Sequence, residues 1–164
     1  MPLLLTMHGL AAGGINTGHT AYNQGDYGAA LQEWRSLAEQ GNAGAQLNLG
    51  FMYDNGYGVP QDYKEAIKWY RKAAEQGNDR AQYNLGLMYD SGYGVPQDYV
   101  QAHMWYNIAG VSHESVAVSY RDIVARGMTP DQVAEAQRLA REWLEKHPYA
   151  DKDATIVLQT HIPR

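Results

Sequence analysis

The chain has 164 residues, of which 45% are hydrophobic and 19% are charged, and its formal net charge is −5. This length and composition fit one globular domain, and the negative charge disfavours nucleic acid and anionic membranes as partners. The absence of cysteine excludes disulfides and thiolate metal sites, and no apolar stretch approaches the roughly 18 residues of a membrane-spanning helix.

Residues 1–14 have two interpretations. Leu3 to Ala12 could be the core of a worn signal peptide, although no Lys or Arg precedes it and no A-x-A cleavage site follows. The alternative is a flexible leader. The sequence is therefore compatible with a cytoplasmic protein and with a periplasmic or secreted one. Because glycine disfavours helix, Gly13 and Gly14 predict that the first helix begins only after them.

Residues 15–44 form a clipped copy of a repeat that continues downstream. The segment 25–46 matches the segment 61–82 at 11 of 22 positions with an offset of 36. Its turn, GHTAYNQGDY (18–27), is similar to a tetratricopeptide turn and lacks the longer turn of the later copies. We therefore expect a shortened first helix in this unit.

Residues 45–80 and 81–114 are two full copies of the repeat. The segments 45–73 and 81–109 are identical at 20 of 29 positions, where about two would match by chance. In each copy, apolar residues at helical spacing are followed by the turn GYGVP, in which glycine ends a helix and proline prevents its continuation. Each copy therefore predicts a helical hairpin, and hairpins of this kind must stack into a solenoid to bury both faces.

Local signals add detail to the hairpin. Asp62 and Asp98 are expected to cap the second helices, with Glu65 and Gln101 completing capping boxes. Glycine inside a helix costs about 1 kcal/mol relative to alanine. The glycines within the first helices, Gly50 and Gly86, thus predict a close approach by a neighbouring helix.

The repeat resembles a known family. The pattern A-x-x-x-L-G-x-x-Y-x-x-G-x-G-V-x-x-D-x-x-x-A-x-x-W-Y-x-x-A-A-x-x-G, complete in residues 45–80 and followed as far as Ala109 in the next copy, is similar to the Sel-1-like repeat. The resemblance implies an all-α fold, an α/α solenoid (superhelix), and a role as an adaptor that binds a protein or peptide.

Residues 115–147 are expected to cap the array. Residues 115–128 predict one helix, and Thr129 followed by Pro130 predicts another over roughly 130–145. This ending also resembles the closing segment of many bacterial Sel-1-like proteins, which implies a bacterial origin. Residues 148–164 show no helical period and are expected to form a loose tail.

One face of the second helices differs between the two full copies. The cations Lys64, Lys68 and Lys72 predict a solvated face, with an acidic partner as the alternative. The equivalent positions in the next copy are Val100, Met104 and Ile108. We expect the C-terminal helix to cover this apolar set, with a dimer interface as the alternative.

No catalytic or metal-binding motif is present, and we expect no enzyme activity, no metal and no cofactor. None of the six histidines is paired at i, i+4, and His103 is expected to pack in the core. The partner expected is another protein or peptide, and the chain itself a monomer or weak dimer. Alternatives are a hydrolase acting on cell-wall material or β-lactams, and a structural subunit of a larger envelope assembly.

The resemblance also implies where a partner binds. In tetratricopeptide-like arrays the first helix of each unit lines a concave groove, which here predicts apolar anchors and two asparagines that could bond a peptide backbone. The alternative is that some of these side chains pack between helices. The predicted groove residues are Leu47, Asn48, Phe51, Asp54, Asn55, Arg80, Tyr83, Asn84, Leu87, Asp90 and Ser91.

Overall fold

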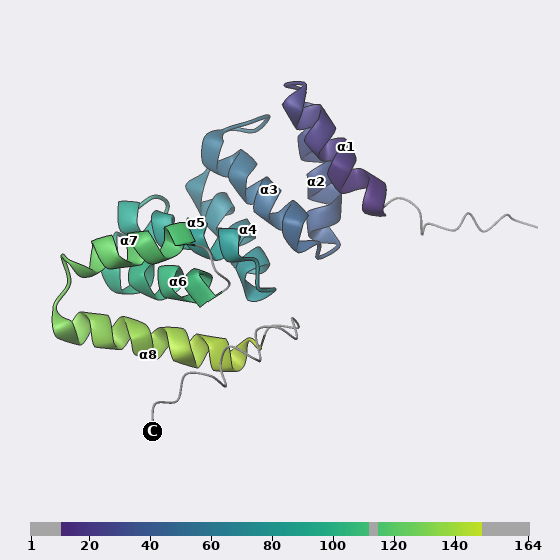
Figure 1. Cartoon of the computed structure of the whole chain (residues 1–164). Coiled ribbons are helices and arrows are strands. Elements are labelled where there is room, and N and C mark those ends of the chain that lie inside the picture. The colour runs from purple at the N-terminus through teal and green to yellow at the C-terminus, as the bar shows by residue number, and fades with distance from the viewer. Residues whose placement is uncertain (1–10, 112–114, 149–164) are drawn as a thin grey trace, which may run out of the picture. The chain divides into compact units, whose positions relative to one another are not determined.

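The computed structural model describes residues 11–111 and 115–148, and only the backbone of residues 11–13. Most of the expected leader and nearly all of the expected tail lie outside these residues. The described residues form eight helices and no strand (Figure 1): α1 (Ala11–Asn23), α2 (Tyr27–Glu39), α3 (Ala43–Asn55), α4 (Tyr63–Glu75), α5 (Asp79–Ser91), α6 (Tyr99–Val111), α7 (Ser115–Ala125) and α8 (Pro130–Lys146). The prediction of an all-α fold made of helical hairpins is confirmed.

The chain divides into two compact units, with the boundary between Trp69 and Tyr70 inside α4. In the first unit α1 packs on α2, and α2 packs on α3. Their shared core holds Trp34, Leu37, Leu49 and Met52, all buried. In the second unit α5 packs on α6, and α6 in turn contacts both α7 and α8.

The start of α1 departs from the prediction. The helix begins at Ala11, runs through Gly13 and Gly14, and has 13 residues, the same length as α3. The expected start after Gly14 and the expected shortened first helix are therefore wrong. What is clipped in this unit is the connection between its helices, which occupies 24–26, against 56–62 in the next unit.

Close packing explains why glycine is accepted within α1. A Cβ at Gly14 would lie 3.0 Å from Cδ1 of Leu37, and a Cβ at Gly18 would lie 2.3 Å from Nε1 of Trp34. Real side chains do not approach so closely, so the missing Cβ atoms allow α2 side chains to pack directly on the backbone of α1. The burial of Trp34 and Leu37 outweighs the low helix propensity of glycine.

Gly86 confirms the expected close approach, although the contacting group is a side chain rather than a neighbouring backbone. A Cβ there would lie 2.4 Å from Cε1 and 2.5 Å from Cδ1 of Tyr106 on α6. Tyr106 is fully buried. The α5–α6 pair is therefore fitted around this ring.

The N-terminal caps of the second helices form one of the two hydrogen bonds predicted for a capping box. The side chains of Asp62 and Asp98 accept hydrogen bonds from the N–H groups of Glu65 (3.1 Å) and Gln101 (3.0 Å). The reciprocal half of the box differs, because the backbone N–H of Asp62 donates to the carbonyl of Tyr53. The longer turn thus supplies a backbone acceptor, and Glu65 instead pairs with Lys68.

A buried glutamine ties each full repeat to the hairpin before it. Gln46 donates through Nε2 to the Ala38 carbonyl at 3.1 Å, and the equivalent Gln82 donates to the Ala74 carbonyl at 3.2 Å. Both acceptors lie in the last turn of a helix, where carbonyls lack helical partners. These bonds explain why glutamine recurs at this buried position.

Two helices, α7 and α8, follow the repeats. Helix α8 runs beside α6 (Figure 1), and Met104 and Ile108 on α6 are buried. Helix α8 opens with a complete capping box between Thr129 and Gln132, and Pro130 occupies its first turn. Two small residues of α8, Ala136 and Ala140, are buried.

Candidate functional site

The predicted groove residues of the first full repeat lie along α3. Phe51 and Asn55 are exposed, whereas Leu47, Asn48 and Asp54 are half-buried. The Asn55 side chain donates to the Phe51 carbonyl at 2.9 Å, so it satisfies its own helix. On this face of α3, the side chains available for contact with a partner are chiefly those around Phe51.

Phe51 belongs to a group of four aromatic rings that we call the aromatic ledge: Tyr22, Tyr27, Phe51 and Tyr57. The Phe51 ring centroid lies 6.3 Å from that of Tyr22 and 5.9 Å from that of Tyr57. Tyr27 and Tyr57 stack at 4.8 Å, and Tyr22 lies 5.2 Å from Tyr27. Phe51 is 39% exposed and the three tyrosines are half-buried. Of this group, only Phe51 was among the predicted groove residues.

The tyrosines of the ledge come from places where helices begin or end. Tyr22 lies near the end of α1, Tyr27 begins α2, and Tyr57 lies in the turn after α3. The connection between α1 and α2 and the turn after α3 lie at the same end of the first unit (Figure 1). Burial, and secondarily Tyr57 and Tyr27, raise the pKa of Tyr22, so its hydroxyl stays protonated at neutral pH.

The predicted groove residues of the second full repeat lie along α5. Arg80 and Ser91 are exposed, whereas Tyr83, Asn84, Leu87 and Asp90 are half-buried. Tyr83 and Leu87 pack against a core formed by Ala102, Tyr106 and Val124. These two apolar residues therefore contribute to packing within the second unit as well as to its surface.

Asp90 has a partner that the sequence did not reveal. The Tyr106 hydroxyl lies 3.5 Å from Oδ2 of Asp90 as a long hydrogen-bond donor. Burial, together with the nearby Asp90 carboxylate, raises the pKa of Tyr106 well above its ordinary value. The tyrosine stays neutral, and the pair ties α5 to α6 rather than forming a reactive site.

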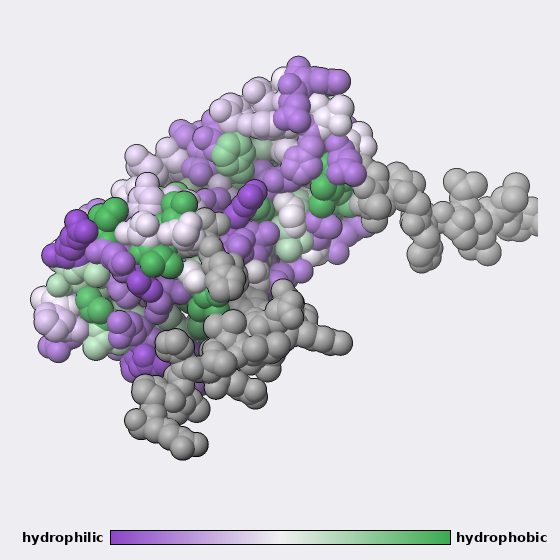
Figure 2. Space-filling model, viewed as in Figure 1, coloured by the Kyte–Doolittle hydropathy of each residue, from purple (hydrophilic) through white to green (hydrophobic). Residues whose placement is uncertain are grey.

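Helix α7 adds residues that the sequence reasoning missed. Tyr120 lies 5.6 Å, ring centroid to centroid, from the predicted groove residue Tyr83. On the same helix, Val116 and Ile123 are 46% and 55% exposed. Figure 2 shows hydrophobic residues among hydrophilic ones in the region of α7. The spacing of seven between Val116 and Ile123 was the available signal, because it places both on one helix face.

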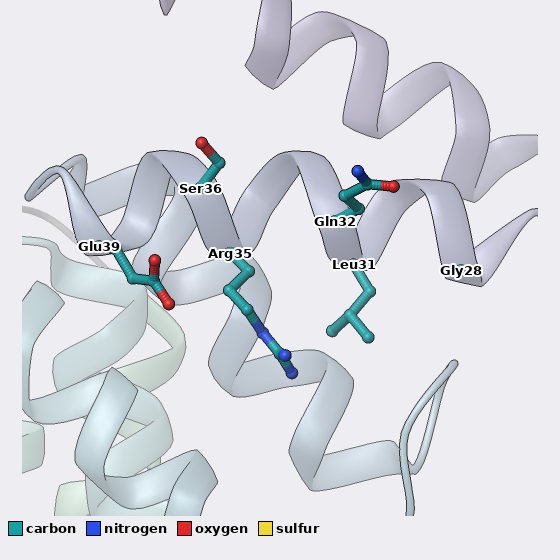
Figure 3. Close-up of a pocket in the computed structure, with 6 residues that line it drawn as sticks. All are labelled: Gly28, Leu31, Gln32, Arg35, Ser36 and Glu39. Carbon is teal, nitrogen blue, oxygen red and sulfur yellow. The ribbon is translucent and has the colours of Figure 1, made fainter.

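A shallow hollow of about 300 Å³ lies along α2. Figure 3 shows that its lining side chains all come from this one helix: Gly28, Leu31, Gln32, Arg35, Ser36 and Glu39. Arg35 is already engaged, because Nη2 donates to the Tyr53 hydroxyl at 2.9 Å. A helix face of this kind offers a contact surface and no enclosed site.

Other predicted features fall outside these surfaces. Lys64, Lys68 and Lys72 are exposed, and His103 is packed in the core at 2% exposure. Within 11–111 and 115–148, no three His, Asp or Glu side chains gather in a way that could hold a metal ion. In the same ranges no helix is both long and apolar enough to cross a membrane.

Comparison with known proteins agrees with the repeat. A family model described as Sel1 repeat matches residues 43–78 and 79–110. Among curated proteins, none matches the chain significantly.

Two solved structures are similar to the chain. One is a protective antigen present in uropathogenic Escherichia coli strains that displays an SLR fold, with 32% identity, a TM-score of 0.86 and coverage of 94% of this chain. The other is a Sel1 repeat protein from Oxalobacter formigenes, with 32% identity, a TM-score of 0.65 and coverage of 78% of this chain. The chain spans 33% of the first protein and 55% of the second. The α/α solenoid class expected from the repeat is thereby confirmed.

Proposed function

Because this chain is a Sel1-repeat protein, we propose that it is an adaptor that binds a peptide or helix of another protein through the first helices of its repeats. The Sel1-repeat fold commonly serves as a protein-interaction scaffold, and that is the general basis of the proposal. Its specific part is two surfaces, the outward side chains of α3 in the first unit and those of α5 in the second.

The observation that carries the proposal is the exposure of one large apolar side chain, Phe51, on the first helix of a full repeat. Phe51 on α3 is the chain's one phenylalanine, yet it is exposed. A large exposed ring surrounded by half-buried tyrosines resembles the aromatic anchors that dominate many protein interfaces. The second helix of the same repeat differs, because the exposed face of α4 carries charge, as at Lys64 and Lys68.

Affinity capture from the native host tests the surface. The bait is the full chain, compared with an Asn48→Ala/Phe51→Ala/Asn84→Ala variant and with a control variant, Gln32→Ala/Lys64→Ala, whose changes lie on α2 and α4. Circular dichroism establishes that all three are equally helical. We expect the first variant to lose partners that the control retains. Identical partner lists from all three proteins would remove the first helices from the proposal.

The proposal is for binding without catalysis, as the similarity to Sel1 repeats and to an SLR fold suggests. Purified protein incubated with a chromogenic β-lactam and with peptidoglycan should show no turnover above buffer. Turnover that scales with protein concentration and survives further purification would replace the adaptor with the hydrolase alternative.

A further inference from the structure

We propose that the aromatic ledge binds a cationic side chain, arginine or lysine, presented by the partner. This inference rests on the proposed function and gives the chemistry of one contact. The chain's one phenylalanine, Phe51, is exposed within this ledge.

The fold itself does not require a ring at this position. The equivalent residue of the next repeat, 36 positions later, is Leu87, and it lies in a helix of the same length with the same N-cap and C-cap residue types. Leucine therefore satisfies the repeat at this position. The ring at Phe51 adds π surface that a partner can reach, because 39% of the residue stays accessible.

The arrangement of the rings favours a cation. Phe51 lies at interplanar angles of 65° to Tyr22 and 43° to Tyr57, so the rings do not present a single flat plate. Aromatic faces carry negative charge density that attracts ammonium and guanidinium groups, and arginine in particular stacks on them. The tyrosine hydroxyl oxygens of the ledge can also accept hydrogen bonds from such groups.

The charges near the ledge have the complementary sign. The ledge contains no basic residue, and the exposed Asp26 directly precedes Tyr27 while Asp54 follows Phe51 by one helical turn. Over residues 11–69 there are six acidic and three basic residues. Of the basic ones, Arg35 donates to the Tyr53 hydroxyl and Lys68 pairs with Glu65. An acidic partner segment would be repelled here, and a basic one attracted.

The probe pair for the test is N-acetyl-arginine amide and its neutral isostere N-acetyl-citrulline amide, added to the full chain. Ring-labelled phenylalanine gives NMR signals from Phe51 alone, because the chain has one phenylalanine. We expect a saturable shift of the ring signals with the arginine probe at millimolar concentration, and at most a small linear shift with the citrulline probe.

Two matched substitutions locate the charge. Asp26→Asn keeps a side chain that can cap α2 but removes one negative charge beside the ledge. It should weaken the binding of the arginine probe about two- to fivefold at low salt. Asp98→Asn makes the same change at the cap of α6 in the second unit and should leave the titration unchanged. Equal effects of the two substitutions would contradict a local contact.

Three further outcomes would overturn the inference: no saturable shift with arginine, an equal shift with citrulline, or stronger binding of N-acetyl-proline amide, which would indicate a proline-rich partner. These outcomes differ from failure of the proposed function. If the arginine probe gives no saturable shift while partner capture still depends on α3 and α5, only the proposed contact with a cation is contradicted. If the arginine probe binds while the Asn48→Ala/Phe51→Ala/Asn84→Ala variant captures the same partners as the unchanged chain, the proposed adaptor surface is contradicted instead.

Discussion

Replacing Gly86 by alanine should destabilise the protein, although alanine is the better helix former. The new Cβ would lie 2.4 and 2.5 Å from two carbons of the Tyr106 ring and 3.0 Å from a third. Tyr106 is fully buried, so the ring has no room to swing away. Overpacking of this kind costs about 1–3 kcal/mol, against which the helix-propensity gain of about 1 kcal/mol is the smaller effect.

We therefore expect a net loss of up to about 2 kcal/mol from Gly86→Ala, or a fall in Tm of up to roughly 8 °C. Thermal and urea denaturation followed by circular dichroism measure it. The matched control is Gly28→Ala on α2, where the nearest atom to a new Cβ would be an Asp26 carboxylate oxygen at 3.7 Å. That variant should be neutral or more stable. If Gly86→Ala is as stable as Gly28→Ala, the packing explanation of the helical glycines is refuted.

Three further predictions concern stability. Gln82→Ala should cost about 0.5–1.5 kcal/mol in urea unfolding, because it removes a buried hydrogen bond to the Ala74 carbonyl, which then keeps only the bond from the Gly77 N–H; a loss below about 0.3 kcal/mol would contradict this. Thr129→Ala should cost about 1 kcal/mol by removing the capping box of α8, and Thr129→Ser should restore most of it. Burial, and secondarily Arg121, lower the pKa of His103, so the unfolded chain takes up a proton more readily than the folded one. Stability should thus fall as the pH drops below about 6.5, and His103→Ile, which copies Ile67 of the preceding repeat, should weaken that dependence in urea titrations at pH 7.5 and 5.5.

The fold could be predicted because the sequence contains two full copies of the same repeat. A period of 36 with glycine and proline in the turn determines a helical hairpin, and the apolar Met104, at the position of the exposed Lys68, is buried as expected. The start of α1 could not be predicted from Gly13 and Gly14. Local propensity argues against helix there, and the packing of Trp34 and Leu37 that reverses it is a tertiary effect.

The candidate site was predicted less completely than the fold. The resemblance located the faces of α3 and α5, but it could not show that Phe51 contacts Tyr22 and Tyr57, because these rings come from different elements. Tyr120 was missed for a similar reason. It lies on α7, outside the recognisable repeat, and only the packing of α7 within the second unit brings it beside Tyr83.

The central claim is that the first helices of the repeats contact the partner. Its most direct test is photo-crosslinking in the native host, with p-benzoylphenylalanine at position 51 on α3, at position 87 on α5, and at position 32 on α2 as the control. We predict the same crosslinked partner from positions 51 and 87, and none from position 32. Crosslinks from position 32 alone would contradict the account and move the binding surface to α2.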